Sequence, residues 1–282
     1  MTDPLLQAYD DQLREEAEVR EDQQMTRIGP LWCAILGDGA RGFATYRDLG
    51  GVTGTALDDL IEKVIAHYCD ETGVASFEWK TRGHDAPSDL ADHLVAHGFV
   101  AEERETVMVG EAAGLAVDVP LPDGVVVRRA GVGGDLADDA RRASELQERV
   151  FGRSSGPSVE RLVADPQAHA DRLTLWLAET SGQVVSAGRL SIVPGTQFAG
   201  LWGGASDPAW RGRGIYRALT AARARHALAH GVRYLHSDST DMSRPILERN
   251  GLRPVTTTTP YIWTRTDVAH ASSTPSGSVP TG

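Results

Sequence analysis

The stretch that decides the fold is "ASDPAWRGRGIYRALTAARARHALAHG", residues 205–231. A strand-like approach leads into the turn Arg211-Gly212-Arg213-Gly214, and a long Ala/Leu/Arg pattern typical of a helix follows. Free amides at a helix start, its partial positive charge and the arginine side chains favour a bound anion here. A surface turn with solvated arginines is the alternative. Tyr216 is unexpected, because a loop that wraps a phosphate normally has a small residue there.

The segments around this turn alternate between strand and helix patterns. Before the turn, strands are predicted over 125–130, 173–179, 183–193 and 198–206, and helices near 136–150 and 157–168. After its helix come a strand at 232–238, a short helix at 243–251 and a strand at 255–264. Along the strand at 232–238, alternation places Val232, Tyr234, His236 and Asp238 on one face and Leu235 on the other.

The segment "WRGRGIYRAL", residues 210–219, resembles the pyrophosphate-binding motif Gln/Arg-x-x-Gly-x-Gly/Ala of the GCN5-related N-acetyltransferase (GNAT) superfamily. Arg211 and Gly214 stand at the matching positions, and the order of segments across 124–265 is also similar to that family. The resemblance implies that acetyl-CoA is the cosubstrate, that loop amides bind its pyrophosphate, and that the preceding strand splays from the next one to bind the pantetheine arm. The positions carried over are Gly204, Ala205 and Ser206 in the strand and Arg211, Gly212, Arg213, Gly214, Ile215 and Tyr216 in the loop.

The first half of the chain contains a weaker version of the same order. Strands are predicted at 30–36, 41–47, 74–80 and 105–110, and helices over 2–20, 55–69 and 88–98. Both halves end in strand, short helix, glycine and strand, which indicates a duplicated unit or two ordinary αβ pieces. The segment "GDGARG", residues 37–42, matches G-x-G-x-x-G, but strand-like residues follow it, which favours a hairpin over a dinucleotide site.

The resemblance therefore implies an α/β fold of two tandem GNAT-like domains, each a mixed, mostly antiparallel sheet flanked by helices. The expected boundaries are 1–115 for a degenerate copy without cofactor, 116–123 for a linker, 124–266 for the acetyl-CoA-binding domain and 267–282 for a disordered tail. The first copy's loop would be residues 47–59, with Val52 where the last small residue belongs. Asp58 and Asp59 would repel a pyrophosphate from that helix start.

Acetyl transfer to an amine needs a neutral amine, a stabilised oxyanion and a proton for the leaving thiolate. The resemblance implies direct attack in a ternary complex. Many members protonate the thiolate with a tyrosine four residues before the glycine of the last helix, where this chain has Leu247. Candidate catalytic residues are Ser243, His236 and Tyr216, whose alternative roles are a helix cap, a structural histidine and a packed aromatic. A proton carried by water is a further route.

Charge and composition limit the partners. The 282 residues carry a net charge of −11, with −14 over residues 1–115 and +3 over the remainder. A broad basic surface is missing, so nucleic acid is not an expected partner. No apolar run approaches the length needed to span a bilayer and the amino terminus is acidic, so we expect a cytoplasmic protein without a membrane partner. Cys33 and Cys69 lack metal-ligand spacing, and we expect reduced, packed thiols and no metal.

The expected acceptor is a small-molecule or peptide amine, and the expected oligomeric state is a monomer or homodimer. An acidic first half would attract a cationic amine, although solubility explains its charge equally well. A polar and aromatic group in that half, Trp79, Lys80, Arg82, His84 and Asp85, is a candidate surface for the acceptor. A protein that binds acyl-CoA without transfer chemistry is the competing function, and Leu247 favours it.

Overall fold

The computed structural model describes residues 3–19, 24–36, 39, 41–152, 163–164 and 171–265. The predicted tail at 267–282 and nearly all of the predicted helix at 157–168 lie outside these residues. The chain forms two compact units. The larger unit comprises Met1–Leu13 with Thr106–Val255, and the smaller unit comprises Arg14–Glu105 with Thr256–Gly282.

The larger unit contains a mixed sheet in the order β6-β11-β10-β9-β8-β7. Among its described strands, β10 and β11 are the parallel pair, and the other pairs are antiparallel. Its elements are α1 (Pro4–Leu13), β6 (Glu105–Glu111), α4 (Ala112–Leu115), β7 (Val126–Arg129), α5 (Leu136–Phe151), β8 (Leu173–Thr180), β9 (Gln183–Ile192), β10 (Phe198–Ser206), α8 (Ile215–Ala229), β11 (Tyr234–Ser239) and α9 (Arg244–Arg249).

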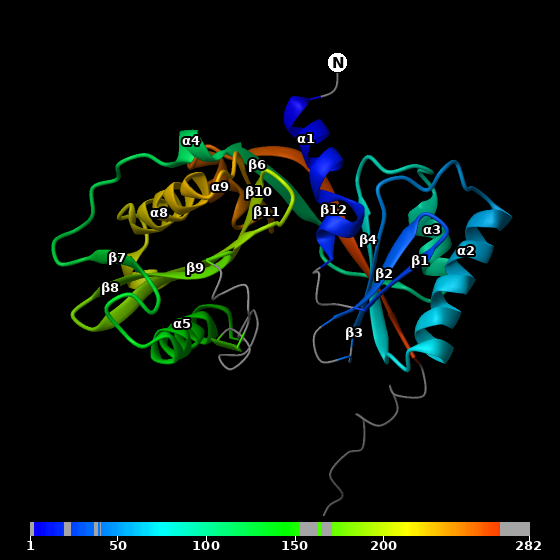
Figure 1. Ribbon diagram of the computed structural model, residues 1–282, viewed down its shortest axis with the longest axis horizontal. Helices are drawn as coiled ribbons and strands as arrows, with labels where there is room; N and C mark the ends of the chain where they lie inside the picture. The colour runs from blue at the N-terminus through cyan, green and yellow to red at the C-terminus, as the bar shows by residue number, and fades with distance from the viewer. Residues whose placement is uncertain are drawn as a thin grey trace, which may run out of the picture. The chain divides into compact units, whose positions relative to one another are not determined.

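Helices cover both faces of this sheet, with α8 on one face and α5 on the other (Figure 1). Alanines at the buried positions of α8, such as Ala224 and Ala227, have short side chains that let the helix axis lie close to the strands. Leu146 of α5 packs with Leu175 and Leu177 on the opposite face. The sheet is therefore buried on both sides around β9 and β10, which fixes the strand that leads into the glycine turn.

The smaller unit has the strand order β1-β2-β3-β4-β12, and β5 also pairs with β12. Its β3 and β4 are parallel and joined through α2, while the other described pairs are antiparallel. Helices α2 and α3 contribute to one apolar core with the sheet. The elements are β1 (Gln24–Ile28), β2 (Leu31–Leu36), β3 (Arg41–Thr45), α2 (Thr55–Ala66), β4 (Ser76–Arg82), α3 (Leu90–Ala96), β5 (Val100–Ala101) and β12 (Arg253–Thr264).

Two local predictions can be compared with these units. Strands β2 and β3 are antiparallel with Leu36 opposite Arg41, as the predicted hairpin requires, while residues 37, 38 and 40 lie outside the described residues. Each unit also contains a parallel strand–helix–strand passage, β3-α2-β4 and β10-α8-β11. The predicted similarity between the ends of the two halves concerns other elements, which are β4, α3 and β6 in the first half and β11, α9 and β12 in the second.

The compact units do not follow the expected linear boundaries at 1–115 and 124–266. Strand β6, expected to close the first half, pairs with β11 in the larger unit. Strand β12, expected to close the second half, pairs with β4 in the smaller unit through Thr258 to Thr264. Helix α1 also belongs to the larger unit, where Tyr9 and Leu13 pack with Val107 and Phe198. Strand pairing is set by contacts distant in sequence, which local patterns do not encode.

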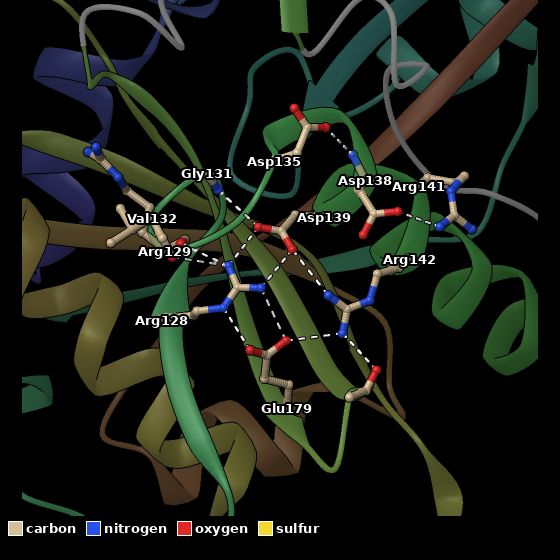
Figure 2. A network of polar contacts seen from close by, with 11 residues as sticks. Arg128, Arg129, Gly131, Val132, Asp135, Asp138, Asp139, Arg141, Arg142 and Glu179 are labelled. Carbon is tan, nitrogen blue, oxygen red and sulfur yellow. Dashed lines mark hydrogen bonds and ion pairs between the residues drawn. The ribbon is translucent and has the colours of Figure 1, made fainter.

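A polar network secures the start of α5 against β7 and β8 (Figure 2). Arg128 donates to both oxygens of Asp139, at 2.6 and 2.7 Å, and to both oxygens of Glu179, at 2.8 and 3.1 Å. Arg142 joins the same two carboxylates, and Gly131 donates its amide to Asp139. The Arg128 hydrogen bonds hold the pKa of Asp139 below its usual value, although burial opposes this.

Candidate functional site

Strand β10 separates from β11 at the position that the sequence predicts. The two strands pair only from Phe198 to Gly200, whereas β10 continues along β9 to Ser206. A bulge lies between Trp202 and Ala205, and Gly203 has φ 59° within it. Ser237 Oγ donates to Leu201 O at 3.0 Å beside the last pair. The edge of β10 that faces away from β9 is thus released from β11 over the second half of the strand.

The three strand residues predicted to bind the pantetheine arm lie in this released part of β10. Ala205 and Ser206 are held by β9, opposite Ala187 and Ser186. Ser186 Oγ donates to Ala205 O at 2.8 Å and shares a hydrogen bond with Ser206 Oγ. Gly204 lies in the bulge. The strand is therefore fixed along one edge. Its other edge is not paired with β11 beyond Gly200, although side chains donate to three carbonyls of this part: Ser237 to Leu201 O, Gln147 Nε2 to Gly203 O at 2.8 Å, and Arg211 to Ser206 O.

The glycine turn provides free amides at the start of α8. Gly212 and Gly214 have φ of 74° and 77°, a left-handed conformation that glycine adopts without strain. Gly214 is the N-cap residue, and Ala218 is the first residue whose amide donates to its carbonyl, at 2.9 Å. The amides from Gly212 to Arg217 have no acceptor among the described residues. Several donors and the positive end of the helix dipole meet here, which suits a diphosphate.

The two arginines of the turn are partly fixed by their neighbours. Arg211 Nε donates to Ser206 O at 3.1 Å, which ties the turn to the end of β10. The Arg213 guanidinium lies 4.8 Å from the centre of the Trp210 ring. Both residues are exposed, so their charges contribute to the positive potential around the free amides.

The expected linker at 116–123 packs along α8. Arg225 donates to Val117 O and Asp118 Oδ1, each at 2.7 Å. A Cβ at Gly214 would lie 3.5 Å from Val119 Cγ1 and 3.6 Å from Pro120 O. This segment, β7 and α8 line an open pocket of about 680 Å³ with mostly apolar walls. One side of the turn is therefore covered by the chain itself.

Tyr216 is the second residue of α8, and its ring is turned toward the sheet. A Cβ at Gly204 would stand 2.7 Å from Tyr216 Oη, so the hydroxyl lies against the backbone of β10. The ring packs on the apolar cluster between α8 and the strands. The backbone amide of Tyr216 is among the free amides at the helix start. The ring of Tyr216 thus packs against the strands, and its amide has no acceptor among the described residues.

The position normally occupied by the family's tyrosine acid belongs to the core. Leu247 is only 3 % exposed and packs with Leu235 and Leu252. Ser243 is the N-cap of α9, but its hydroxyl donates to Thr240 O at 3.2 Å and makes no side-chain cap hydrogen bond. The structure therefore places Ser243 at the predicted cap position without the expected bond.

His236 lies on β11 with its ring beside the released part of β10. Its ring centre is 5.3 Å from that of Trp202 and 6.1 Å from that of Phe198, and the residue is 8 % exposed. Leu235 faces α8 on the other side, as alternation predicts. Val232 differs from the prediction: it precedes β11 and packs in the same cluster as Leu235.

The corresponding place in the smaller unit is filled by a polar network that the sequence did not reveal. Strands β3 and β4 pair up to Ala44 and Trp79. Beyond this pair, Arg14 Nε and Nη2 donate to Tyr46 O at 3.0 and 2.8 Å, and Arg14 pairs with Asp85 at 3.0 Å. Tyr46 Oη donates to Asp85 Oδ2 at 2.6 Å.

A second part of this network surrounds Glu18. Arg82 and Lys80 pair with its carboxylate, and Thr45 donates to it. Burial raises the pKa of Glu18, but these cations and the Thr45 hydrogen bond outweigh burial and lower it. Trp79 is fully buried in the core. The hypothesis that Trp79, Arg82 and Asp85 face an acceptor is therefore wrong, because these side chains are used within the unit.

The loop of the first copy also differs from the turn at 211–216. Helix α2 begins at Thr55 after the N-cap Gly54, so Val52 lies before the helix, whereas Tyr216 lies within α8. The Gly50 amide is engaged by Asp48. Asp58 stands in the first turn of α2 and pairs with His93 at 2.6 Å. These features agree with the prediction that this copy takes no cofactor, which remains a prediction.

Comparisons with known proteins agree with this geometry. Residues 140–251 match the model of the acetyltransferase (GNAT) family. None of the curated proteins is similar in sequence to this chain. A GCN5-related N-acetyltransferase from Kribbella flavida has a similar fold, with a TM-score of 0.67, 16 % identity, and coverage of 94 % of this chain and 96 % of its own.

Two further solved structures have similar folds. A GCN5-related N-acetyltransferase from Sphaerobacter thermophilus has a TM-score of 0.59 and 18 % identity over 83 % of this chain and 76 % of its own. A tandem GNAT protein from the clavulanic acid biosynthesis pathway has a TM-score of 0.58 and 14 % identity over 92 % of this chain and 94 % of its own. At such identities the likeness concerns the fold. The family match covers residues 140–251, a part of the larger unit that includes β10, the glycine turn and α8, and members of that family are generally acetyltransferases.

Proposed function

We propose that this protein is an N-acetyltransferase that transfers an acetyl group from acetyl-CoA to a primary amine of a small molecule or peptide. The observation that carries the proposal is the passage from β10 into α8. A strand released from its neighbour leads into a turn whose amides, from Gly212 to Arg217, have no acceptor among the described residues. Both features match the chemistry of an acyl-CoA: an amide-containing arm and a diphosphate.

The reaction we propose is direct attack in a ternary complex. The free edge of β10 would hold the pantetheine arm and the turn would hold the pyrophosphate. The amine would attack the thioester carbonyl, whose oxygen would be stabilised by a backbone amide of β10 near the bulge at Gly203. The larger unit would therefore contain the cosubstrate site, and the smaller unit would contain none.

Calorimetry with acetyl-CoA on three glycine variants tests this assignment. Gly212→Asp places a carboxylate in the turn, where no atom lies within 4 Å of the new Cβ. Gly133→Asp is the matched control, because Gly133 has φ 73°, similar to the 74° of Gly212, and equally open surroundings. Gly51→Asp, with φ 77° and open surroundings, makes the same change in the first copy.

We expect the wild-type protein to bind one acetyl-CoA per chain. Gly212→Asp should weaken binding at least tenfold, because a fixed negative charge then opposes the pyrophosphate. Gly133→Asp and Gly51→Asp should bind as the wild type does. Unchanged affinity in Gly212→Asp would refute the site, and weakened affinity in Gly51→Asp would show that the first copy contributes.

Acyl-CoA binding without transfer is the second candidate function, and the buried Leu247 favours it because α9 offers no phenol. Thiol release from acetyl-CoA, measured with aminoglycosides, polyamines and lysine peptides as acceptors, distinguishes the two functions. Acceptor-dependent thiol release supports the transferase. Tight binding without release on every acceptor supports the binding protein.

A further inference from the structure

Arg223 is a buried cation whose hydrogen-bond acceptors among the described residues are uncharged groups. The residue lies on α8, is 0 % exposed, and forms no ion pair with a described carboxylate. Its Nε donates to Leu219 O at 3.3 Å, Nη1 to Arg189 O at 3.1 Å, and Nη2 to Thr220 Oγ1 at 3.1 Å. Burial lowers the pKa of Arg223, and the nearby Tyr216 phenol opposes this. Burying a charge without an anionic partner lowers the stability of the fold, so this arrangement calls for a functional explanation.

Two glycines make room for this cation and for the tyrosine beside it. The Arg223 guanidinium carbon lies 5.7 Å from the centre of the Tyr216 ring. A Cβ at Gly188 would stand 2.7 Å from Arg223 Nη1, and a Cβ at Gly204 would stand 2.7 Å from Tyr216 Oη. A side chain at either glycine would therefore displace the pair. The geometry amounts to a phenol set between a buried guanidinium and the bulge of β10.

The phenol occupies a useful place for acyl transfer. Gly204 lies beyond Gly200, the last β10 residue that pairs with β11, and so belongs to the released part of the strand. On the same side of the sheet, Leu247 of α9 supplies no hydroxyl. Tyr216 approaches this part of β10 from α8 instead of α9.

We propose that Tyr216 is the acid that protonates the leaving thiolate and that Arg223 is the positioning residue that holds the phenol and stabilises its anion. This inference rests on the proposed function. As the amine nitrogen bonds to the carbonyl carbon, the carbon–sulfur bond breaks and its electron pair stays on sulfur. The sulfur takes the phenol proton of Tyr216. The phenolate then takes, through water, the proton that the amine loses, so the products are the amide and the free thiol.

The first experiment measures contact with sulfur without requiring turnover. Calorimetry compares CoA with desulfo-CoA, in which hydrogen replaces the thiol, on the wild type, Tyr216→Phe and Tyr234→Phe. Tyr234 is a matched control because it is buried, packs against Phe198, and lies on β11 rather than α8. We expect wild type and Tyr234→Phe to bind CoA about fivefold more tightly than desulfo-CoA, and Tyr216→Phe to bind both alike.

The second experiment tests Arg223 through pH. Between pH 7 and pH 9 the anionic fraction of the CoA thiol increases. The preference for CoA over desulfo-CoA should rise over this range in the wild type and in Arg223→Lys, because a cation behind the phenol favours a negative charge at its oxygen or at the sulfur. Arg223→Met should lose the rise. A purely structural role would weaken both ligands equally and leave the ratio and its pH dependence unchanged.

The outcomes separate this inference from the proposed function. If the wild type binds neither ligand, the proposed function fails and the inference fails with it. If the wild type binds both ligands with equal affinity, or if Tyr216→Phe retains the preference for CoA, the cosubstrate site stands and the inference is overturned. Thermal melting checks that each variant folds. If Arg223→Met does not fold, Tyr216→Phe decides instead. A rise with pH in its preference for CoA over desulfo-CoA that equals the rise in the wild type overturns the role of the pair.

Discussion

The hydroxyl of Tyr216 lies so close to Gly204 that position 204 has no room for a side chain: a Cβ there would stand 2.7 Å from Oη and 2.8 Å from Cε2. Gly204→Ala must therefore displace the ring or shift the bulge of β10. We expect a loss of about 1–3 kcal/mol in the free energy of unfolding, the usual cost of overpacking. Urea denaturation followed by tryptophan fluorescence measures it.

A matched change elsewhere separates overpacking from the general effect of replacing glycine. Gly114 lies in α4, and no atom is within 4 Å of its added Cβ. Gly114→Ala should be neutral or slightly stabilising, because alanine favours a helix. Equal stability of Gly204→Ala and the wild type would mean that the ring is not packed against β10 as described.

The passage from β10 to α8 was predictable because its signals are local. Gly212 and Gly214, the arginines and the helix pattern after them fall within a few residues, and the turn forms where they stand. The departure of Tyr216 from the motif that the turn resembles is visible for the same reason. The direction of its ring is not, because it depends on Gly204 in another strand.

The features that escaped prediction depend on partners distant in sequence. Arg223 is one of several arginines in the Ala/Leu/Arg pattern of the helix, and its burial depends on Gly188 on β9, where a Cβ would stand 2.7 Å from Arg223 Nη1. Arg14 follows a helix at the start of the chain, yet it binds the carbonyl of Tyr46. The pairing of β12 with β4 joins residues more than 170 positions apart. A periodicity identifies a buried face, but it does not identify which surface covers that face.

The polar network at the start of α5 should contribute strongly to stability. Asp139 is 1 % exposed and receives two hydrogen bonds from Arg128 (Figure 2). Asp139→Asn removes the charge but leaves Arg128 and Arg142 partly buried, so we expect a loss of about 3 kcal/mol in the free energy of unfolding. Chemical denaturation at pH 7 measures it.

An exposed ion pair on the same helix is the control for Asp139. Arg141 and Glu145 pair one turn apart, with side chains 56 % and 49 % exposed. Glu145→Gln should change stability by less than about 0.5 kcal/mol, because water screens the pair. Similar losses in Asp139→Asn and Glu145→Gln would contradict the assigned importance of burial.

The same network predicts how stability depends on acid pH. Hydrogen bonds from Arg128 lower the pKa values of both Asp139 and Glu179 below their ordinary values of 3.8 and 4.5. A carboxyl group whose pKa is lower in the folded state stabilises the protein. This stabilisation is complete at pH values above the pKa of the unfolded state and is lost as pH falls through the pKa of the folded state. The stability difference between wild type and Asp139→Asn should therefore be constant above about pH 5 and shrink below about pH 4. A constant difference down to pH 2 would contradict this assignment.

Cys33 should be inert toward thiol reagents while the protein is folded. It is 1 % exposed, and burial raises the pKa of its thiol to about 12, with a hydrogen bond from Tyr68 opposing this rise. At pH 8 little thiolate therefore exists to react. In a Cys69→Ser variant, labelling by a chromogenic disulfide should be slow in buffer and immediate in denaturant. Rapid labelling in buffer would mean that Cys33 is accessible in the native protein.

The contact between α2 and α3 predicts a histidine that titrates above its ordinary range. The hydrogen bond that His93 Nδ1 donates to Asp58 Oδ1, at 2.6 Å, is the main cause of the raised pKa of His93, and Asp89 adds to it. Because the pKa of His93 is raised in the folded state, the stabilisation from this contact is complete at pH values below the unfolded-state pKa of 6.5. It is lost as pH rises through the pKa of the folded state. Histidine ring resonances followed by NMR from pH 5 to pH 9 should report this pKa. Asp58→Asn should lower it, whereas Asp59→Asn, an exposed neighbour, should not. The two aspartates stand side by side near the start of α2, but of the two only Asp58 contacts the His93 ring, so Asp59→Asn controls for the loss of a charge. Equal titration curves of His93 in both variants would show that Asp58 does not stabilise the imidazolium.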